Sequence, residues 1–191
     1  MNKIKMFAPV SMDGYASRID GDMDWALHYL EGRNHGFEDF ISTIGSVVFN
    51  LAHYRMFQSY GLRWQYGNLP CHVITRRHIT YPPSQNIRPL VLHNGAKLSD
   101  KEQLDRLHQG EGDIWLAGNN ELVSQFLDMG MVDEVTLLIL PVTLGNGLPL
   151  ARANSGESQW ELREREHFDN GMVRLRYYHI GTVSQFEMNL I

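Results

Sequence analysis

The chain has 191 residues, of which 43% are hydrophobic and 20% charged, and this is enough for one well-filled core. A disordered or collagen-like chain is therefore excluded. The net charge of −5 and the pI near 6.0 disfavour a nucleic-acid partner, because no positive field would hold a phosphate backbone. The apolar run 135–140 is far shorter than the ~20 residues of a membrane-spanning helix, so no membrane partner is expected.

Short apolar runs rich in β-branched residues predict strands along most of the chain. In chain order they cover residues 4–10, 46–49, 72–75, 89–93, 113–117 and 135–142. Helical or loop segments separate them, which is the alternation expected of an α/β sheet.

The first predicted helix follows an apolar stripe. Phe37, Phe40, Ile41 and Ile44 recur at positions i, i+3, i+4 and i+7, which places them on one helix face. This spacing predicts a helix that ends at Gly45 and packs on the sheet.

Two further helices are indicated by their end signals. Ser99 and Glu102 form a capping-box pattern, and Gly110 provides the stop for this second helix. A third helix is predicted over residues 120–130, between the 113–117 and 135–142 strands. The order strand, helix, strand predicts a parallel crossover there.

The end of the chain predicts a different arrangement. Residues 160–168 and 172–180 are two long strand candidates, and the Asn170-Gly171 dipeptide between them is a strong hairpin signal. The predicted fold is an α/β, mostly parallel sheet with helices on both faces and a C-terminal antiparallel hairpin. No linker or repeat divides the chain, so residues 1–191 are expected to form a single domain.

Cysteine and histidine usage bears on compartment and metal binding. The single cysteine, Cys71, allows no internal disulfide, and Pro9, Ser11 and Asp13 interrupt any secretory signal, so a cytoplasmic location is expected. Nine histidines occur without a His-x-x-x-His or Cys-x-x-Cys spacing, and no metal site is expected.

Ligands of open α/β sheets bind at the carboxyl ends of the strands. Four segments that follow predicted strands are therefore candidate sites, namely 11–16, 50–54, 75–77 and 117–120. The last one precedes a helix, whose free N–H groups and positive end suit a diphosphate. A plain turn that is capped by Asn119 or Asn120 explains the same residues, and both interpretations stay open.

These segments and their flanks carry a resemblance to a known family. They read Ser11-Met12-Asp13-Gly14-Tyr15-Ala16, Val73-Ile74-Thr75-Arg76, Asp113-Ile114-Trp115-Leu116-Ala117-Gly118, Leu127-Asp128-Met129-Gly130-Met131-Val132-Asp133-Glu134 and Leu140-Pro141-Val142-Thr143-Leu144-Gly145-Asn146-Gly147-Leu148-Pro149-Leu150. In this order and spacing they make the chain similar to the dihydrofolate reductase-like family. Within it, the chain most resembles the branch of the riboflavin-pathway reductase domain and its stand-alone bacterial relatives, over residues 3–180.

The resemblance implies a reductase that passes hydride from NADPH to a small pterin-, pyrimidine- or ribosylamino-pyrimidine-type substrate. Residues 117–122 would match the diphosphate-binding turn, and 75–77 would flank the adenosine 2′-phosphate. The cofactor-binding positions implied are Ala8, Asn50, Leu51, Ala52, His53, Thr75, Arg76, Arg77, Ala117, Gly118, Asn119, Asn120, Glu121 and Leu122.

The resemblance also implies the catalytic and substrate positions. Asp13 would bind the substrate or relay a proton, although Asp13-Gly14 is also an ordinary turn dipeptide. The substrate-binding positions expected are Met12, Trp25, Leu140 and Gly145. Trp25 equally fits the core-facing turn of an amphipathic helix.

Two departures from the family pattern bear on cofactor binding. Asn50-Leu51 stands where the family has Gly-Arg, and Asn119 stands where it has glycine. The alternative function is therefore a ligand-binding or scaffold protein that keeps the fold without the cofactor, and a flavin-bound oxidoreductase is a third. A homodimer is expected, because the family often pairs through sheet edges and the hairpin has an outer edge to cover.

Overall fold

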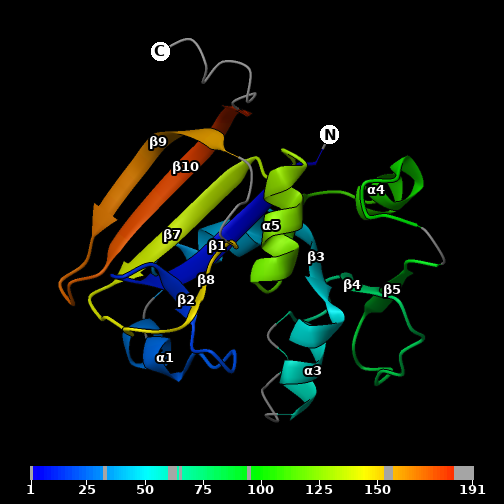
Figure 1. The fold of residues 1–191 in the computed structure, drawn as a ribbon, viewed down its shortest axis with the longest axis horizontal. Helices are drawn as coiled ribbons and strands as arrows, with labels where there is room; N and C mark the ends of the chain where they lie inside the picture. Colours follow the sequence, from blue (N-terminus) through cyan, green and yellow to red (C-terminus); the bar gives the residue numbers. More distant parts are fainter. Residues whose placement is uncertain are drawn as a thin grey trace.

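The computed structural model describes residues 2–31, 34–59, 64, 66–93, 96–152 and 157–182. One eight-stranded mixed sheet, in the order β5-β4-β3-β6-β1-β7-β10-β9, runs through the molecule (Figure 1). A small sheet of two short strands, β2 (Tyr15–Ser17) and β8 (Leu148–Pro149), lies beside it. The predicted fold class, a mostly parallel sheet that ends in an antiparallel hairpin, is confirmed.

All of the predicted parallel strands are present, most with slightly different ends. Their bounds are β1 Ile4–Ser11, β3 Ile44–Asn50, β4 Cys71–Thr75, β5 Ile87–Val91, β6 Asp113–Leu116 and β7 Glu134–Leu140. Strand β1 pairs in parallel with β6 on one side and β7 on the other. The connection from β6 to β7 therefore crosses over β1, as a parallel crossover must.

The predicted hairpin is also confirmed. Strands β9 (Ser158–His167) and β10 (Val173–Thr182) pair antiparallel, and β10 joins the main sheet by antiparallel pairing with β7. Gly171 adopts a φ of +84° in the turn, a conformation that glycine takes without steric cost.

Helices cover both faces of the sheet. They are α1 Asp24–Leu30, α2 Phe37–Ser42, α3 Leu51–Ser59, α4 Lys101–Leu107 and α5 Asn120–Asp128. Phe126 of α5 packs with Met6 and Ile114 on one face, whereas Phe40 of α2 packs in a second cluster on the other. In Figure 1, α5 lies in front of the sheet, and α1 and α3 lie toward its lower edge.

Two details of the helix predictions are wrong. Ile44 opens strand β3 instead of closing helix α2, which ends at Ser42. A Cβ at Gly45 would lie on the backbone oxygen of Glu111, so the chain here is forced into close contact with the segment that enters β6. Helix α4 begins after Asp100, which makes no side-chain cap, and the expected capping box at Ser99 is not formed.

Candidate functional site

The connections that leave β3 and β6 diverge at the carboxyl edge of the sheet. Helix α3 leads from β3 to β4, whereas α5 leads from β6 across β1 to β7, in the opposite direction along the strand order. Such a switch point leaves a crevice between two helix N-termini, and ligands of open α/β sheets bind there.

A cavity of about 840 Å³ opens at this edge. Its walls come from β1, the end of β2 with the turn that follows it (residues 16–21), helices α1 and α3, the segment 115–120 that joins β6 to α5, and the segment 148–150. A volume in the range of about 300–1,000 Å³ is typical of sites for small molecules and cofactors. The cavity is therefore the candidate ligand site.

Apolar side chains form much of the wall on the α1 side. Ile19 and Leu27 line the cavity while 62% and 58% exposed, which is unusual for large apolar residues. Met23, Leu30 and Met56 extend the same wall. A flat apolar ring placed here would remove these side chains from water, at about 25 cal/mol for each Å² of apolar surface.

Among the described residues, Asp20 and Arg55 are the only Asp, Glu, Lys or Arg side chains that line the cavity. The Asp20 carboxylate accepts a hydrogen bond from the Asp22 backbone N–H at 3.0 Å. His53 also lines the cavity, and burial lowers its pKa to about 4, so its ring is uncharged at neutral pH. Its Nε2 lies 3.1 Å from the Tyr66 hydroxyl.

Two asparagines join the helix ends across the crevice. Asn50 Oδ1 accepts from the His53 N–H at 3.0 Å, and Asn119 Oδ1 accepts from the Leu122 N–H at 3.2 Å, so each asparagine caps its own helix. Asn50 Nδ2 also donates to Asn119 Oδ1 at 2.6 Å. Asn119 therefore caps the turn before α5, as one of the two interpretations of this segment predicted. The first N–H groups of α5, which precede Leu122, have no acceptor within the helix and can still meet an anion.

Gly118 allows the first turn of α5 to lie against the end of β6. A Cβ at this position would come 2.5 Å from Leu122 Cδ2, and Leu122 is buried in the core. Only glycine fits this approach without displacing Leu122.

The structure brings half of the expected cofactor positions to the cavity. The expected residues that line it are Ala8, Ala52, His53, Ala117, Gly118, Asn119 and Asn120. Asn50 reaches the same crevice through its hydrogen bond to Asn119.

The other expected cofactor positions lie outside the cavity lining. Leu51 packs on the apolar cluster around Phe49, and Leu122 is part of the opposite core. Glu121 pairs with Arg152 at 2.7 Å. The Thr75 hydroxyl is engaged by the backbone N–H and C=O of Arg77, while the side chains at 76 and 77 are exposed.

Asp13 fastens two loops together and does not line the cavity. Its carboxylate accepts hydrogen bonds from the Ser11 hydroxyl at 2.6 Å, the Leu144 N–H at 3.1 Å and the Gly145 N–H at 2.8 Å. The Ser11 hydrogen bond, with smaller contributions from the two backbone amides, lowers the pKa of Asp13. An ionised carboxylate with these contacts acts as a loop anchor.

The expected substrate positions also lie outside the cavity lining. Trp25 and Leu140 are buried together with Leu138 and Met172, which is the core role that the helical spacing of Trp25 allowed. Met12 is exposed, and Gly145 belongs to the loop that Asp13 holds.

Sequence reasoning missed the residues that form much of the cavity wall, chiefly Ile19, Leu27, Arg55 and Met56. A signal was present in α3, where Ala52, Arg55 and Met56 recur at i, i+3 and i+4 and so share one helix face. The segment around Ile19 gives no such signal, because residues 18–21 form an irregular turn without a repeating pattern.

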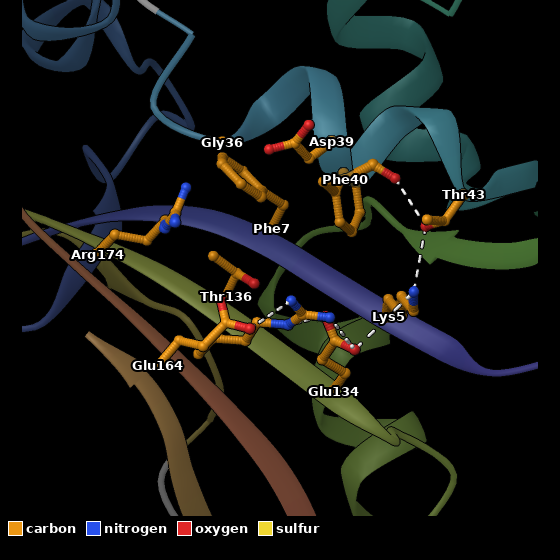
Figure 2. Close-up of a pocket in the computed structure, with 11 residues that line it drawn as sticks. Lys5, Phe7, Gly36, Asp39, Phe40, Thr43, Glu134, Thr136, Glu164 and Arg174 are labelled. Atoms are coloured by element: carbon orange, nitrogen blue, oxygen red, sulfur yellow. Dashed lines mark hydrogen bonds and ion pairs between the residues drawn. The ribbon is translucent and has the colours of Figure 1, made fainter. Parts of the chain in front are cut away.

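A second, smaller cavity of about 250 Å³ lies between α2 and the sheet (Figure 2). Most of its charged groups already have an ionic partner. Lys5 Nζ lies 2.6 Å from Asp113, and Arg176 contacts Glu134 at 2.7 Å and Glu164 at 3.0 Å. Because these charges already have partners, this cavity is an internal ionic network and offers little to a ligand.

Comparison with known proteins identifies the family of the chain. A model of the RibD C-terminal domain matches residues 63–174, more than half of the chain. The chain belongs to the RibD C-terminal domain family. Over 176 residues, this RibD C-terminal domain protein is 28% identical to the uncharacterized protein YwjB of Bacillus subtilis (strain 168), covering 92% of the chain and 97% of YwjB.

Solved structures share the fold of this RibD C-terminal domain protein. A putative riboflavin biosynthesis protein from Shewanella sp. PV-4 matches with a TM-score of 0.76 and 18% identity, over 93% of this chain and 99% of that one. Dihydrofolate reductase from Enterococcus faecalis, in a complex with NADP(H), matches with a TM-score of 0.59 and 13% identity, over 93% and 96% of the two chains. The dihydrofolate reductase-like fold is therefore confirmed. None of the described helices is long and apolar enough to span a membrane.

Proposed function

We propose that this protein is an NADPH-dependent reductase of a small pterin-, pyrimidine- or ribosylamino-pyrimidine-type heterocycle. One observation carries the proposal: a single cavity joins the apolar wall around Ile19 and Leu27 to the first turn of α5 at the switch point. This continuity allows a ring compound and a dinucleotide to lie in contact. Family membership and the shared fold support the same class of reaction.

The residues at the crevice fit a dinucleotide. The cavity has the size of a cofactor site, Gly118 keeps the strand end free of a side chain, and the first amides of α5 point to where a diphosphate would lie. When bound, the nicotinamide ring would supply a hydride.

The chain's own residues would bind and orient the reactants. We assign Ala8 and Pro9 of β1 to the nicotinamide, and Gly118, Asn119 and Asn120 to the diphosphate. The apolar wall would exclude water from the substrate ring. Asp13, which the resemblance assigns to proton relay, would act on the substrate only through water, because its carboxylate lies outside the cavity lining.

Titration with NADPH tests this proposal. The wild-type chain should bind NADPH saturably by calorimetry, with a matching change in nicotinamide fluorescence. Ala52→Trp should weaken binding strongly, because Ala52 lines the cavity at the start of α3 and an indole there would occupy space that the dinucleotide needs. Gln125→Trp provides the control, since Gln125 is exposed on α5 and does not line the cavity. Wild-type protein that gives no saturable signal with NADPH or NADH contradicts the proposal.

The paired asparagine caps favour a second candidate, a ligand-binding protein without a nicotinamide cofactor. Asn50 and Asn119 bond to each other where phosphate oxygens would otherwise approach the two helix ends. A thermal-shift screen separates the candidates, because a ligand that binds the native state raises the melting temperature. Stabilisation by folates, flavin precursors or nucleotides, with none by NADPH or NADH, would favour the second candidate.

We also propose that the protein is a homodimer. The side chains of β9 from Glu161 to His167 are exposed, and β9 is the last strand of the sheet, so its outer edge is open to pairing. The charged residues and register shifts of this hairpin could instead protect the edge of a monomer. Size-exclusion chromatography with light scattering distinguishes a dimer of about twice the 22.0 kDa chain mass from a monomer.

A further inference from the structure

Arg55 occupies a distinctive place in the cavity. Helix α3 presents Ala52, Arg55 and Met56 to the cavity, and it buries Tyr54 in the core on its other face. Arg55 is thus fixed on the ligand side of a helix whose opposite side is anchored. Its side chain is exposed and free to adapt to a bound group.

Arg55 is also the only cation that the described residues contribute to the cavity wall. Among the described residues, no other lysine or arginine lines the cavity, and Arg55 takes part in none of the ion pairs. His53, two residues earlier on α3, is neutral at physiological pH because burial lowers its pKa to about 4. Within the described part of the chain, an anionic ligand would therefore meet one positive side chain, that of Arg55.

The position of Arg55 on the helix brings it toward the crevice. Helical side chains lean toward the N-terminus, so Arg55 covers the turn that begins at Leu51 and Ala52. Leu51 packs in the core and carries no charge, and the methyl group of Ala52 leaves room above the helix. The hydrogen bond from Asn50 to Asn119 places this end of α3 beside the start of α5.

We propose that Arg55 binds a phosphoryl group of the ligand in the large cavity. A guanidinium offers a planar fork of donors that matches phosphate oxygens, and it keeps its charge at every physiological pH. The inference rests on the proposed function, because it takes this cavity as the ligand site. The phosphoryl group belongs either to the dinucleotide or to a phosphorylated heterocycle.

Binding measurements on three variants test the role of Arg55. The probes are NADPH, NADH, and the pair FMN and riboflavin, which differ by one phosphate. Arg55→Gln should weaken the binding of the probe whose phosphate Arg55 contacts by about tenfold to a hundredfold. This is the loss expected of a charge-assisted hydrogen bond. Arg55→Lys keeps the charge and should recover part of this loss. Arg163→Gln removes a charge from the exposed strand β9 and should leave the affinity for every probe unchanged.

The probes distinguish the source of the phosphoryl group. Equal losses for NADPH and NADH assign Arg55 to the diphosphate, and a loss for NADPH alone assigns it to the ribose phosphate. A loss for FMN without one for riboflavin or the dinucleotides assigns it to a phosphorylated heterocycle.

Other results overturn the inference. It fails if Arg55→Gln leaves every phosphorylated probe within twofold of wild type, or if it weakens riboflavin as much as FMN. Wild-type protein that binds FMN and no dinucleotide refutes the proposed reductase. In that case the comparison of FMN with riboflavin in Arg55→Gln still tests whether Arg55 binds a phosphoryl group. Wild-type protein that binds no phosphorylated probe refutes both.

Discussion

Gly118 shows how a single missing side chain shapes the candidate site. A Cβ there would lie 2.5 Å from Leu122 Cδ2 and 2.9 Å from Leu122 Cβ, and Leu122 is itself buried in a core cluster. We expect Gly118→Ala to lower the free energy of unfolding by about 1–3 kcal/mol, as overpacking does. Urea denaturation measures this change. Gly181→Ala is the control, since a Cβ there meets nothing within 4 Å, and an equal loss in both variants would contradict the explanation.

Asp13 allows a test of pH dependence. Hydrogen bonds hold its pKa below the ordinary value of 3.8 in the folded protein, so ionised Asp13 stabilises the fold. This contribution is fully present above pH 3.8 and is lost as the pH falls through the lower, folded-state pKa. We therefore expect Asp13→Asn to melt at a lower temperature than wild type at neutral pH, and the difference to shrink below pH 3.8. Thermal melts at a series of pH values measure it.

The same variant separates the two roles considered for Asp13. A loop anchor predicts a lower melting temperature, because the two backbone amides at Leu144 and Gly145 lose a charged acceptor. A proton relay predicts a fall in kcat at an unchanged melting temperature. A fall in kcat without a fall in melting temperature would assign Asp13 a role in proton transfer.

At the scale of elements, helices α3 and α5 should depend on each other for their N-terminal stability. Asn50→Ala and Asn119→Ala each remove a cap, at a cost of about 1–2 kcal/mol. Because the two side chains also share a hydrogen bond of 2.6 Å, the double variant should lose about 0.5–1.5 kcal/mol less than the sum of the single losses. A double-mutant cycle in urea measures this coupling, and strict additivity would show that the bridge contributes nothing.

Elements that follow a local pattern were predictable, and those made by distant contacts were not. The Asn170-Gly171 turn specifies its hairpin, and the apolar spacing of α5 with its asparagine cap specifies that helix. Strands β2 (Tyr15–Ser17) and β8 (Leu148–Pro149) are too short to give a pattern and exist only by pairing with each other. Ile44 fitted a helical stripe, yet the tight approach at Gly45 places it in a strand.

The two parts of the candidate site also differ in how far the sequence predicts them. Local motifs predicted the crevice residues around Gly118 and Asn119, because a strand followed directly by a helix has a recognisable sequence. The apolar wall with Ile19 and Leu27 was not predictable, since it forms only when the segment after β2 and helix α1 meet over the sheet. Of the four substrate positions that were inferred by resemblance, Trp25 and Leu140 are buried in the core.

At the scale of the whole molecule, a buried ionic network ties the terminal hairpin to the first strand (Figure 2). Glu134 of β7 is 2% exposed, accepts two hydrogen bonds from Arg176 of β10 at 2.7 and 3.1 Å, and lies 3.9 Å from Lys5 of β1. Glu134→Gln leaves Arg176 short of a buried partner, and we expect a loss of about 3 kcal/mol in the free energy of unfolding. Lys5 keeps its ion pair with Asp113, which limits the loss.

Glu164→Gln removes the exposed partner of Arg176 and should cost under about 1 kcal/mol. Denaturation curves of both variants, compared at one pH and salt concentration, measure the difference, and similar losses would mean that the network does not join the two parts of the sheet.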